Sequence, residues 1–268
     1  MPELPEVETI VRDLNKSLQG KKISNVAVHD AFLLRQKADD FIDRLKDRTI
    51  EKITRRGKVV IVHLSSRGFL VIQLMMTGQL IVDGRGDKHA RVEFNFSDGS
   101  RLLYNDQRRF GQLRVVSDLS EIKHFSILGP EPFSKEFTPA FMRAVFQKTV
   151  RPIKNVLLDH TFVAGIGNIY ACEILFRSRI NPKRQACRIK LNEARNIHQQ
   201  IIKVLKEAIT HRGSSMRNYR DGSGQKGRFN ERLAVYARQN QPCPFCKNQI
   251  QRITQSARST FYCPHCQK

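Results

Sequence analysis

The sequence predicts a multi-domain α+β protein: an N-terminal helix with a β-sandwich, then a helical domain, then a small C-terminal β-hairpin that carries four cysteines. Three observations predict this order. Apolar residues recur at helical spacing near the N-terminus, short β-like runs separated by glycines fill residues 23–116, and helical spacing returns near residue 138. A chain of 268 residues is long enough for about two domains. We expect boundaries at 1–130 for the β-sandwich domain, 131–232 for the helical domain and 233–268 for the hairpin.

The first helix is predicted by one apolar face. Its residues recur at i, i+3, i+4, i+7 and i+11, and they are Val7, Ile10, Val11, Leu14 and Leu18. Pro5 suits a position in the first turn, and Glu6 and Glu8 complement the positive end of the helix dipole. The chain therefore begins with a helix that buries one side.

Short strands are predicted next, because β-like runs alternate with glycine turns over the following segment. The clearest runs are 59–64, 69–74, 80–82, 91–96, 101–104 and 112–116. Strands of this length and spacing are typical of a sandwich or a barrel. Residues 128–133, with the sequence Leu-Gly-Pro-Glu-Pro-Phe, read as a linker.

Helices return after the linker. Thr138 is predicted to cap a helix that reaches about residue 147, followed by shorter helices at 153–158 and 169–176. Asn192 is predicted to cap a long helix that extends to residue 211. The stretch 213–228 is rich in glycine, serine and arginine and holds few apolar residues, so we expect a mobile loop there.

The C-terminal hairpin contains two Cys-x2-Cys pairs that lie sixteen residues apart. Four thiolates at this spacing can bind one Zn²⁺ tetrahedrally, which predicts a zinc ribbon with one structural zinc ion. A pair of disulfides is the alternative, but it requires an oxidising compartment. Only Cys172 and Cys187 remain elsewhere, so we expect a reducing, cytoplasmic setting. The predicted metal ligands are Cys243, Cys246, Cys263 and Cys266.

The charge balance favours a polyanionic partner. Lys and Arg number 47 against 25 Asp and Glu, which gives a formal net charge of +22. Nucleic acid is the first candidate for such a chain. No segment approaches the ~18 consecutive apolar residues of a membrane span, and the acidic start of the chain does not fit a signal peptide. We expect no association with a membrane.

The N-terminus is unusually acidic for this basic chain. Removal of Met1 would leave Pro2 as a secondary amine, and an α-amine titrates at about 7.7–8.0, well below lysine. Such an amine can attack an aldehyde-like sugar carbon and form an iminium ion, and the neighbouring Glu3 is placed for acid–base work. From these residues alone, an ordinary helix start explains the same pattern.

Several motifs in order resemble the formamidopyrimidine-DNA glycosylase family. The likeness covers essentially the whole chain. The motifs are Pro-Glu-Leu-Pro-Glu-Val-Glu at 2–8, Arg-Arg-Gly-Lys at 55–58, Asn-Asp-Gln-Arg-Arg-Phe-Gly at 105–111, Leu-Gly-Pro-Glu-Pro at 128–132, Gly-Ile-Gly-Asn-Ile-Tyr at 165–170 and Thr-Phe-Tyr-Cys at 260–263.

This resemblance implies a helix–two-turns–helix element in the helical domain and a bifunctional DNA glycosylase and abasic-site lyase. Such an enzyme excises oxidised purines (8-oxoguanine and formamidopyrimidines) and cuts the strand by β,δ-elimination. Pro2 would be the nucleophile that forms the Schiff base, Glu3 the acid and Glu6 its support. Lys58 would contact phosphate and assist elimination, and Arg258 would hold the phosphate of the lesion.

The resemblance also implies the residues that contact DNA. Met76, Arg108 and Phe110 would fill the space of an extruded base. The full implied set is Met76, His89, Arg108, Arg109, Phe110, Lys154 and Asn168, and the implied lesion loop holds Ser215, Met216, Arg217, Asn218 and Tyr219. Gln73 stands where many relatives carry histidine, and Ala90 with Arg91 departs from a more usual His-x-His pair. We expect altered phosphate contacts at these positions.

Three functions remain open from the sequence. The first is the oxidised-purine enzyme, acting as a monomer on double-stranded DNA that contains oxidised bases or abasic sites, at the bacterial nucleoid. An endonuclease VIII-type enzyme for oxidised pyrimidines is the second, but Leu4 and the long 213–228 loop argue against it. The third is a DNA-binding zinc protein without catalysis. The joint presence of Pro2, Glu3, Glu6 and Lys58 argues against that function, since binding to phosphates needs no acidic N-terminus.

Overall fold

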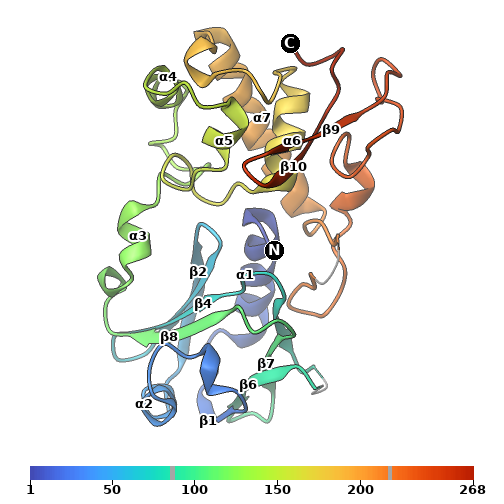
Figure 1. Ribbon diagram of the computed structural model, residues 1–268. Coiled ribbons are helices and arrows are strands. Elements are labelled where there is room, and N and C mark those ends of the chain that lie inside the picture. The colour runs from blue at the N-terminus through green and yellow to red at the C-terminus, as the bar shows by residue number, and fades with distance from the viewer. Residues whose placement is uncertain (85–87, 217–218) are drawn as a thin grey trace. The chain divides into compact units, whose positions relative to one another are not determined.

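The computed structural model describes residues 1–84, 88–216 and 219–268 (Figure 1). It confirms a mixed α+β fold with an N-terminal β-sandwich, a helical domain and a C-terminal hairpin. No described helix combines the length and the apolar character that crossing a bilayer requires.

The chain forms two compact units. The first contains Met1–Ser126 and Ile209–Asn230, and the second contains Ile127–Ala208 and Glu231–Lys268. The segment after residue 208 therefore returns to the unit that holds the N-terminus. This return brings the 213–228 segment against the first helix.

The predicted first helix is α1 (Leu4–Leu18), with a proline in its first turn. Every residue of the predicted apolar face is buried. That face packs on strands of the first unit, and Asn15 fixes it in place. The Asn15 side chain donates to Ile53 O at 2.5 Å and accepts from Ile53 N at 2.8 Å.

Two four-stranded antiparallel sheets form the sandwich of the first unit. One sheet has the order β1 (Ile23–Val28), β6 (Ala90–Phe96), β7 (Arg101–Asp106), β5 (Gly78–Val82). The other has the order β2 (Ile50–Arg56), β3 (Val59–Leu64), β4 (Gly68–Gln73), β8 (Gln112–Val116). The six strands predicted from clear runs are all present, and β1 and β2 complete the sheets.

The main core of the first unit combines apolar residues from α1 and from both sheets. β3 is buried along nearly its whole length, so its burial does not alternate. A second small cluster explains this, because Val59, Val71 and Val116 pack with Ile122 on the other face of that sheet. The short helices α2 (Ala38–Asp43) and α3 (Lys123–Ile127) were not predicted.

The second unit is built on helices. These are α4 (Pro139–Gln147), α5 (Ile153–Leu157), α6 (Asn168–Arg177) and most of α7 (Leu191–Thr210). The Thr138 cap is confirmed, since its Oγ1 accepts from Phe141 N at 3.1 Å. Short 3-10 turns lie at Ala31–Leu33, Leu119–Glu121, Ala186–Arg188 and Phe229–Arg232.

The predicted cap of the long helix was wrong. α7 already begins at Leu191, and Ala194 N donates to Lys190 O at 2.9 Å. Glu193 reaches back to accept from Lys190 N at 2.8 Å. A glutamate that satisfies this amide moves the helix start before Asn192, which lies in the first turn.

The C-terminal hairpin pairs β9 (Gln251–Gln255) with β10 (Arg258–Tyr262). β10 lies against α6 in the second unit (Figure 1). Apolar residues of both elements share one cluster with Cys243 and Cys263, and Cys246 and Cys266 pack against that cluster. The hairpin is therefore fixed to the helices of its own unit.

Candidate functional site

The N-terminal acidic pair is buried. Glu3 and Glu6 are 4% and 2% exposed, and Pro2 is also buried. Both oxygens of Glu6 accept hydrogen bonds: Oε2 from Glu3 N at 2.8 Å and Oε1 from Ser214 N at 2.7 Å. One carboxylate therefore connects the start of α1 to the segment that follows α7.

Lys58 lies half-buried in the turn between β2 and β3. A chain of polar contacts leads from α1 to this turn. Glu8 accepts from Arg55 Nε at 2.8 Å, and Arg55 Nη1 donates to Gly57 O at 3.4 Å. Burial alone would raise the pKa of Glu8, but its contacts with Arg12 and Arg55 outweigh burial and lower it. The helix that begins beside Pro2 and the turn that carries Lys58 are thus linked through Arg55.

The structure brings Met76, Arg108 and Phe110 together. Arg108 donates to the Met76 sulfur at 3.2 Å, and its guanidinium lies 4.7 Å from the centre of the Phe110 ring. Met76 is 41% exposed and Phe110 is 47% exposed. A cation held between two exposed apolar side chains can fill the space left in a base stack and donate to an unpaired base.

A buried carboxylate, Asp106, positions this group. It accepts from Thr77 Oγ1, from Arg108 N at 3.2 Å and from Gly111 N at 2.8 Å. The turns that carry Met76 and Arg108 therefore share one anchor. Asp106 was not singled out in the sequence, although an acid at the start of an Arg-Arg-Phe turn was a usable signal.

Arg109 and His89 have different surroundings. Arg109 pairs with Asp30, with Nε and Oδ2 2.6 Å apart, and stacks over the Phe32 ring at 5.1 Å. His89 is half-buried, and its carbonyl accepts from Asp106 N at 3.0 Å. The Arg109 side chain therefore contacts Asp30 and Phe32, and His89 meets Asp106 through a backbone hydrogen bond.

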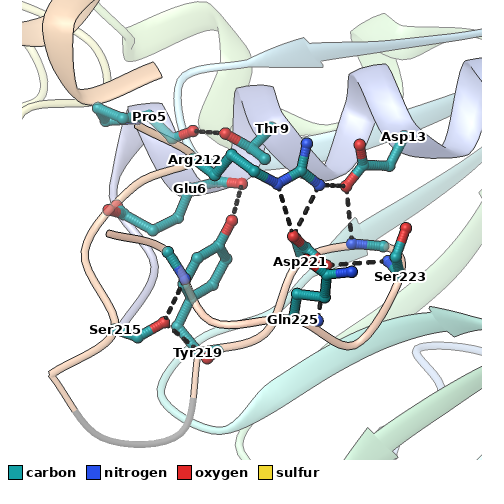
Figure 2. Close-up of polar contacts among 12 residues, drawn as sticks. Pro5, Glu6, Thr9, Asp13, Arg212, Ser215, Tyr219, Asp221, Ser223 and Gln225 are labelled. Carbon is teal, nitrogen blue, oxygen red and sulfur yellow. Dashed lines mark hydrogen bonds and ion pairs between the residues drawn. The ribbon is translucent and has the colours of Figure 1, made fainter. Parts of the chain in front are cut away.

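The described part of the 213–228 segment is packed, although its composition predicted a mobile loop. Tyr219 is buried, and Asp221 is fully buried and accepts from Ser223 N and Gln225 N (Figure 2). Hydrogen bonds to buried acids replace the apolar burial that the sequence lacks. Ser215 donates to Tyr219 O at 3.0 Å, and Met216 is exposed. The predicted loop residues Arg217 and Asn218 lie outside the described residues.

Three predicted residues meet at β10 in the second unit. Lys154 is fully buried and donates to Thr260 Oγ1 at 2.7 Å and to Ser259 O at 3.3 Å. Asn168 also donates to Ser259 O, at 2.9 Å. Arg258 precedes this residue and is exposed. Lys154 and Asn168 therefore hold the strand that presents Arg258.

The four predicted cysteines form one cluster. Their sulfur atoms all lie within 4.8 Å of one another, with Cys243 and Cys266 3.8 Å apart and Cys246 and Cys263 3.5 Å apart. A tetrahedron with Zn–S bonds of about 2.3 Å has edges of about 3.8 Å. The donor set and its spacing fit one zinc ion.

The thiols of this cluster differ in acidity. Burial raises the pKa of Cys263 and of Cys266. Burial also opposes ionisation of Cys246, but hydrogen bonds with Asn248 outweigh it and lower the pKa to about 6. A bound dication stabilises all four thiolates, so zinc and the cysteines require each other.

Glu173 is a second buried acid that the sequence did not predict, and it holds the segment that leads to the cysteine cluster. Glu173 on α6 is fully buried and accepts from the backbone amides of Ala234, Val235 and Tyr236 at 2.9–3.0 Å. Burial raises its pKa, against the effect of these hydrogen bonds. The segment that leads into the hairpin is thus attached to α6. A lone glutamate among apolar helix residues was the only signal in the sequence.

Comparisons with known proteins agree with this arrangement. Residues 1–113 match the formamidopyrimidine-DNA glycosylase N-terminal domain, residues 128–220 match the H2TH domain of the same enzymes, and residues 240–268 match a zinc finger found in FPG and IleRS. Formamidopyrimidine-DNA glycosylases from Chloroflexus aurantiacus and Desulforamulus reducens are each 41% identical to the chain. The alignments cover 100% of this chain and 98% and 99% of those proteins.

Solved structures give the same result. Lactococcus lactis Fpg, in a complex with DNA that contains an abasic site, superposes with a TM-score of 0.93 at 32% identity, and the match covers 99% of each chain. MutM (Fpg) from Thermus thermophilus superposes with a TM-score of 0.90 at 37% identity and covers 99% of this chain and 98% of that one.

The sandwich, the helical domain and the four-cysteine hairpin together define a DNA-binding repair glycosylase with a zinc finger. The family resemblance of the motifs is confirmed over the full length of the chain. The chain belongs to the formamidopyrimidine-DNA glycosylase family, whose members are glycosylases of base excision repair.

Proposed function

We propose that this protein excises oxidised purines from double-stranded DNA and then cuts the strand as an abasic-site lyase, with Pro2 as the nucleophile. The buried acidic pair at the proline-led start of α1 carries this proposal. Two carboxylates in a basic chain are buried beside one residue that can supply an amine of low pKa. Binding to phosphate groups alone would not require acids there.

The chemistry begins once Met1 has been removed. The Pro2 nitrogen forms a bond to C1′ of the damaged nucleotide, and the bond from C1′ to the base breaks, so that its electron pair leaves with the base, which takes up a proton. Glu3 gives a proton to the ring oxygen as the sugar opens, and the amine proton is lost, which leaves an iminium ion at C1′. Glu6 holds Glu3 through its amide.

Strand cutting follows from the iminium ion. Loss of a proton from C2′ expels the 3′ phosphate, and a second loss from C4′ expels the 5′ phosphate. Lys58 and Arg258 are the proposed cations for these phosphates, and Lys58 also assists proton transfer. Water finally hydrolyses the imine and releases Pro2. The base that left the stack is replaced by Met76, Arg108 and Phe110, whose exposure and mutual contact support this role.

Borohydride trapping tests this proposal directly. A duplex with one 8-oxoguanine opposite cytosine is incubated with the protein and borohydride, and the cross-linked peptide is mapped. We expect a covalent adduct on Pro2. An adduct that forms only with an oxidised pyrimidine would indicate the endonuclease VIII-type activity. Absence of an adduct with either lesion, with Met1 shown to be removed by intact mass, would refute the imine mechanism.

A further inference from the structure

Helix α1 has a second face that is polar, in which Glu6 and Thr9 are buried and Asp13 is half-buried. Glu6, Thr9 and Asp13 recur at i, i+3 and i+7, so they share one face of the helix. The 213–228 segment contacts this face at two places about two turns apart (Figure 2). Near the helix start, Ser214 N donates to Glu6, and further along Gly222 N donates to Asp13 Oδ2 at 3.0 Å.

Arg212 joins the second contact to the interior of the segment. Its Nη2 lies 2.6 Å from Asp13 Oδ2, and its Nε donates to Asp221 Oδ2 at 2.7 Å. Burial would lower the pKa of Arg212, but the hydrogen bonds with Asp13 and Asp221 outweigh burial and raise it. One guanidinium is therefore clamped between an acid of α1 and an acid of the segment. We call these three residues the clasp.

The backbone of Arg212 adopts an uncommon conformation at the clasp. Its φ of +61° lies in the left-handed region, which a non-glycine residue adopts at a cost of about 1 kcal/mol or more. Gly213, which follows, also has a positive φ of +76°. The chain thus turns, just after the end of α7, at the residue whose side chain makes both ion pairs.

Close packing leaves this segment little freedom at its anchors. A Cβ at Gly213 would lie 2.7 Å from Glu6 Oε1, and one at Gly222 would lie 2.6 Å from Asp13 Cβ. The two ends of the segment also meet each other, since Ser214 pairs with Arg228 in an isolated β-bridge. The segment is therefore a closed loop with two fixed points on α1, and Ser215 through Tyr219 lie between those points in the sequence.

We propose that Asp13, Arg212 and Asp221 are positioning residues that hold the base of the 213–228 loop in register with the N-terminal helix. The described loop residues Ser215, Met216 and Tyr219 are then held near the extruded base when Pro2 attacks its sugar. This inference rests on the proposed function. An abasic site has no base to be covered, so its cleavage needs Pro2 and the phosphate contacts but not the loop. The clasp therefore matters for excision of a damaged base and not for cleavage at an abasic site.

The test compares two substrates of the same sequence under single-turnover conditions, a duplex with 8-oxoguanine and a duplex with a preformed abasic site. We expect Asp13→Ala and Arg212→Ala each to slow base excision by about tenfold or more. Cleavage of the abasic duplex should stay within about twofold of the wild-type rate. The two variants change the net charge in opposite directions, so a shared effect cannot arise from general attraction to DNA.

Two controls sharpen the result. Asp13→Asn keeps an oxygen that can accept from Arg212 and Gly222, so it should lose less excision activity than Asp13→Ala. Lys226→Ala removes an exposed cation from the same loop and leaves both ion pairs in place, so both rates should stay within about twofold. Hydrogen exchange of the loop amides should rise in Asp13→Ala and remain unchanged in Lys226→Ala.

The outcomes separate the two proposals. Equal loss of both activities in the clasp variants, or no loss of either, overturns the positioning role while wild-type activity upholds the proposed function. A wild-type protein that acts on neither duplex refutes the proposed function itself. A selective loss of base excision, with abasic-site cleavage retained, supports the positioning role of the clasp residues.

Discussion

Glu6 uses both of its oxygens, one toward the amide of Glu3 and one toward the amide of Ser214. A residue that sequence analysis assigned to acid support is therefore also the attachment point of a distant loop. Single side chains with two roles recur in this protein. Asp106 and Arg212 behave in the same way, since each connects segments far apart in the chain.

Replacement of Pro2 should separate strand cleavage from DNA binding. Pro2→Gln should lower strand cleavage by roughly 10³-fold, because removal of a covalent nucleophile removes the step itself. Binding to lesion DNA should remain close to wild type, since the proposed phosphate contacts lie elsewhere. Gel-shift and cleavage assays on one duplex measure both quantities. Loss of binding together with cleavage would show that Pro2 serves the fold.

The ion pair between Glu8 and Arg55 predicts a pH effect on stability. The pKa of Glu8 in the folded protein lies below its ordinary value, so its contribution is present above that ordinary pKa and is lost as pH falls through the folded pKa. Both side chains are mostly buried, and we expect the pair to add roughly 0.5–1 kcal/mol to the free energy of unfolding.

Glu8→Gln tests this effect through unfolding curves from neutral pH down to the acidic range in which carboxylates titrate. The stability gap between wild type and Glu8→Gln should close as the solution becomes acidic. Glu51→Gln on β2, an exposed carboxylate, serves as the control and should show no such gap. A gap that stays constant across the range would contradict the assignment.

At the scale of elements, the turns after β4 and β7 depend on Asp106. Asp106→Asn would point an NH₂ group at donors, so we expect a loss of about 2 kcal/mol in unfolding free energy. Lesion binding should weaken as well, because Met76 and Arg108 lose their common anchor. Tyr104→Phe is the matched control, since its hydroxyl donates to Asp106 only at 3.4 Å and its loss should cost less than about 1 kcal/mol. Equal effects of both variants would argue against the anchor.

The zinc hairpin predicts a coupled loss. Cys263→Ser should release the metal and lower DNA affinity by roughly tenfold or more, because β10 carries Arg258 and needs the metal to keep its place. Cys187→Ser, outside the cluster, should change neither quantity. Metal content and binding isotherms of both variants give the answer. Normal DNA binding by the metal-free variant would contradict this link between the metal and DNA affinity.

At the scale of the whole molecule, the excess of positive charge should govern affinity. With a net charge of +22, binding to DNA should weaken steeply with salt, and the plot of log K against log[salt] should have a slope of magnitude about 4 or more. Titrations between low and physiological salt measure it. A flat response would exclude phosphate contacts as the main source of affinity.

The sequence predicted local features well and tertiary polar contacts poorly. Periodicity located α1 and six strands, because each pattern records which side of an element is buried. The cysteine spacing located the metal cluster. Asp106, Glu173 and the clasp were not predicted, since a buried acid becomes visible only when distant amides or a guanidinium approach it. The same limit explains why 213–228 was expected to be mobile.

The hydroxyl group of Tyr104 also restricts which substitutions this chain can accept during evolution. A Cβ at Gly111 would overlap that oxygen, and a Cβ at Gly78 would lie 2.7 Å from it. Neither glycine is held in the left-handed region, so occupied space and not backbone geometry forbids larger residues. Descendants of this chain should therefore replace Gly111 only after, or together with, a smaller residue at Tyr104. Tyr104 and Gly111 should therefore change together, and lineages in which Tyr104 is replaced first can then accept a larger residue in place of Gly111.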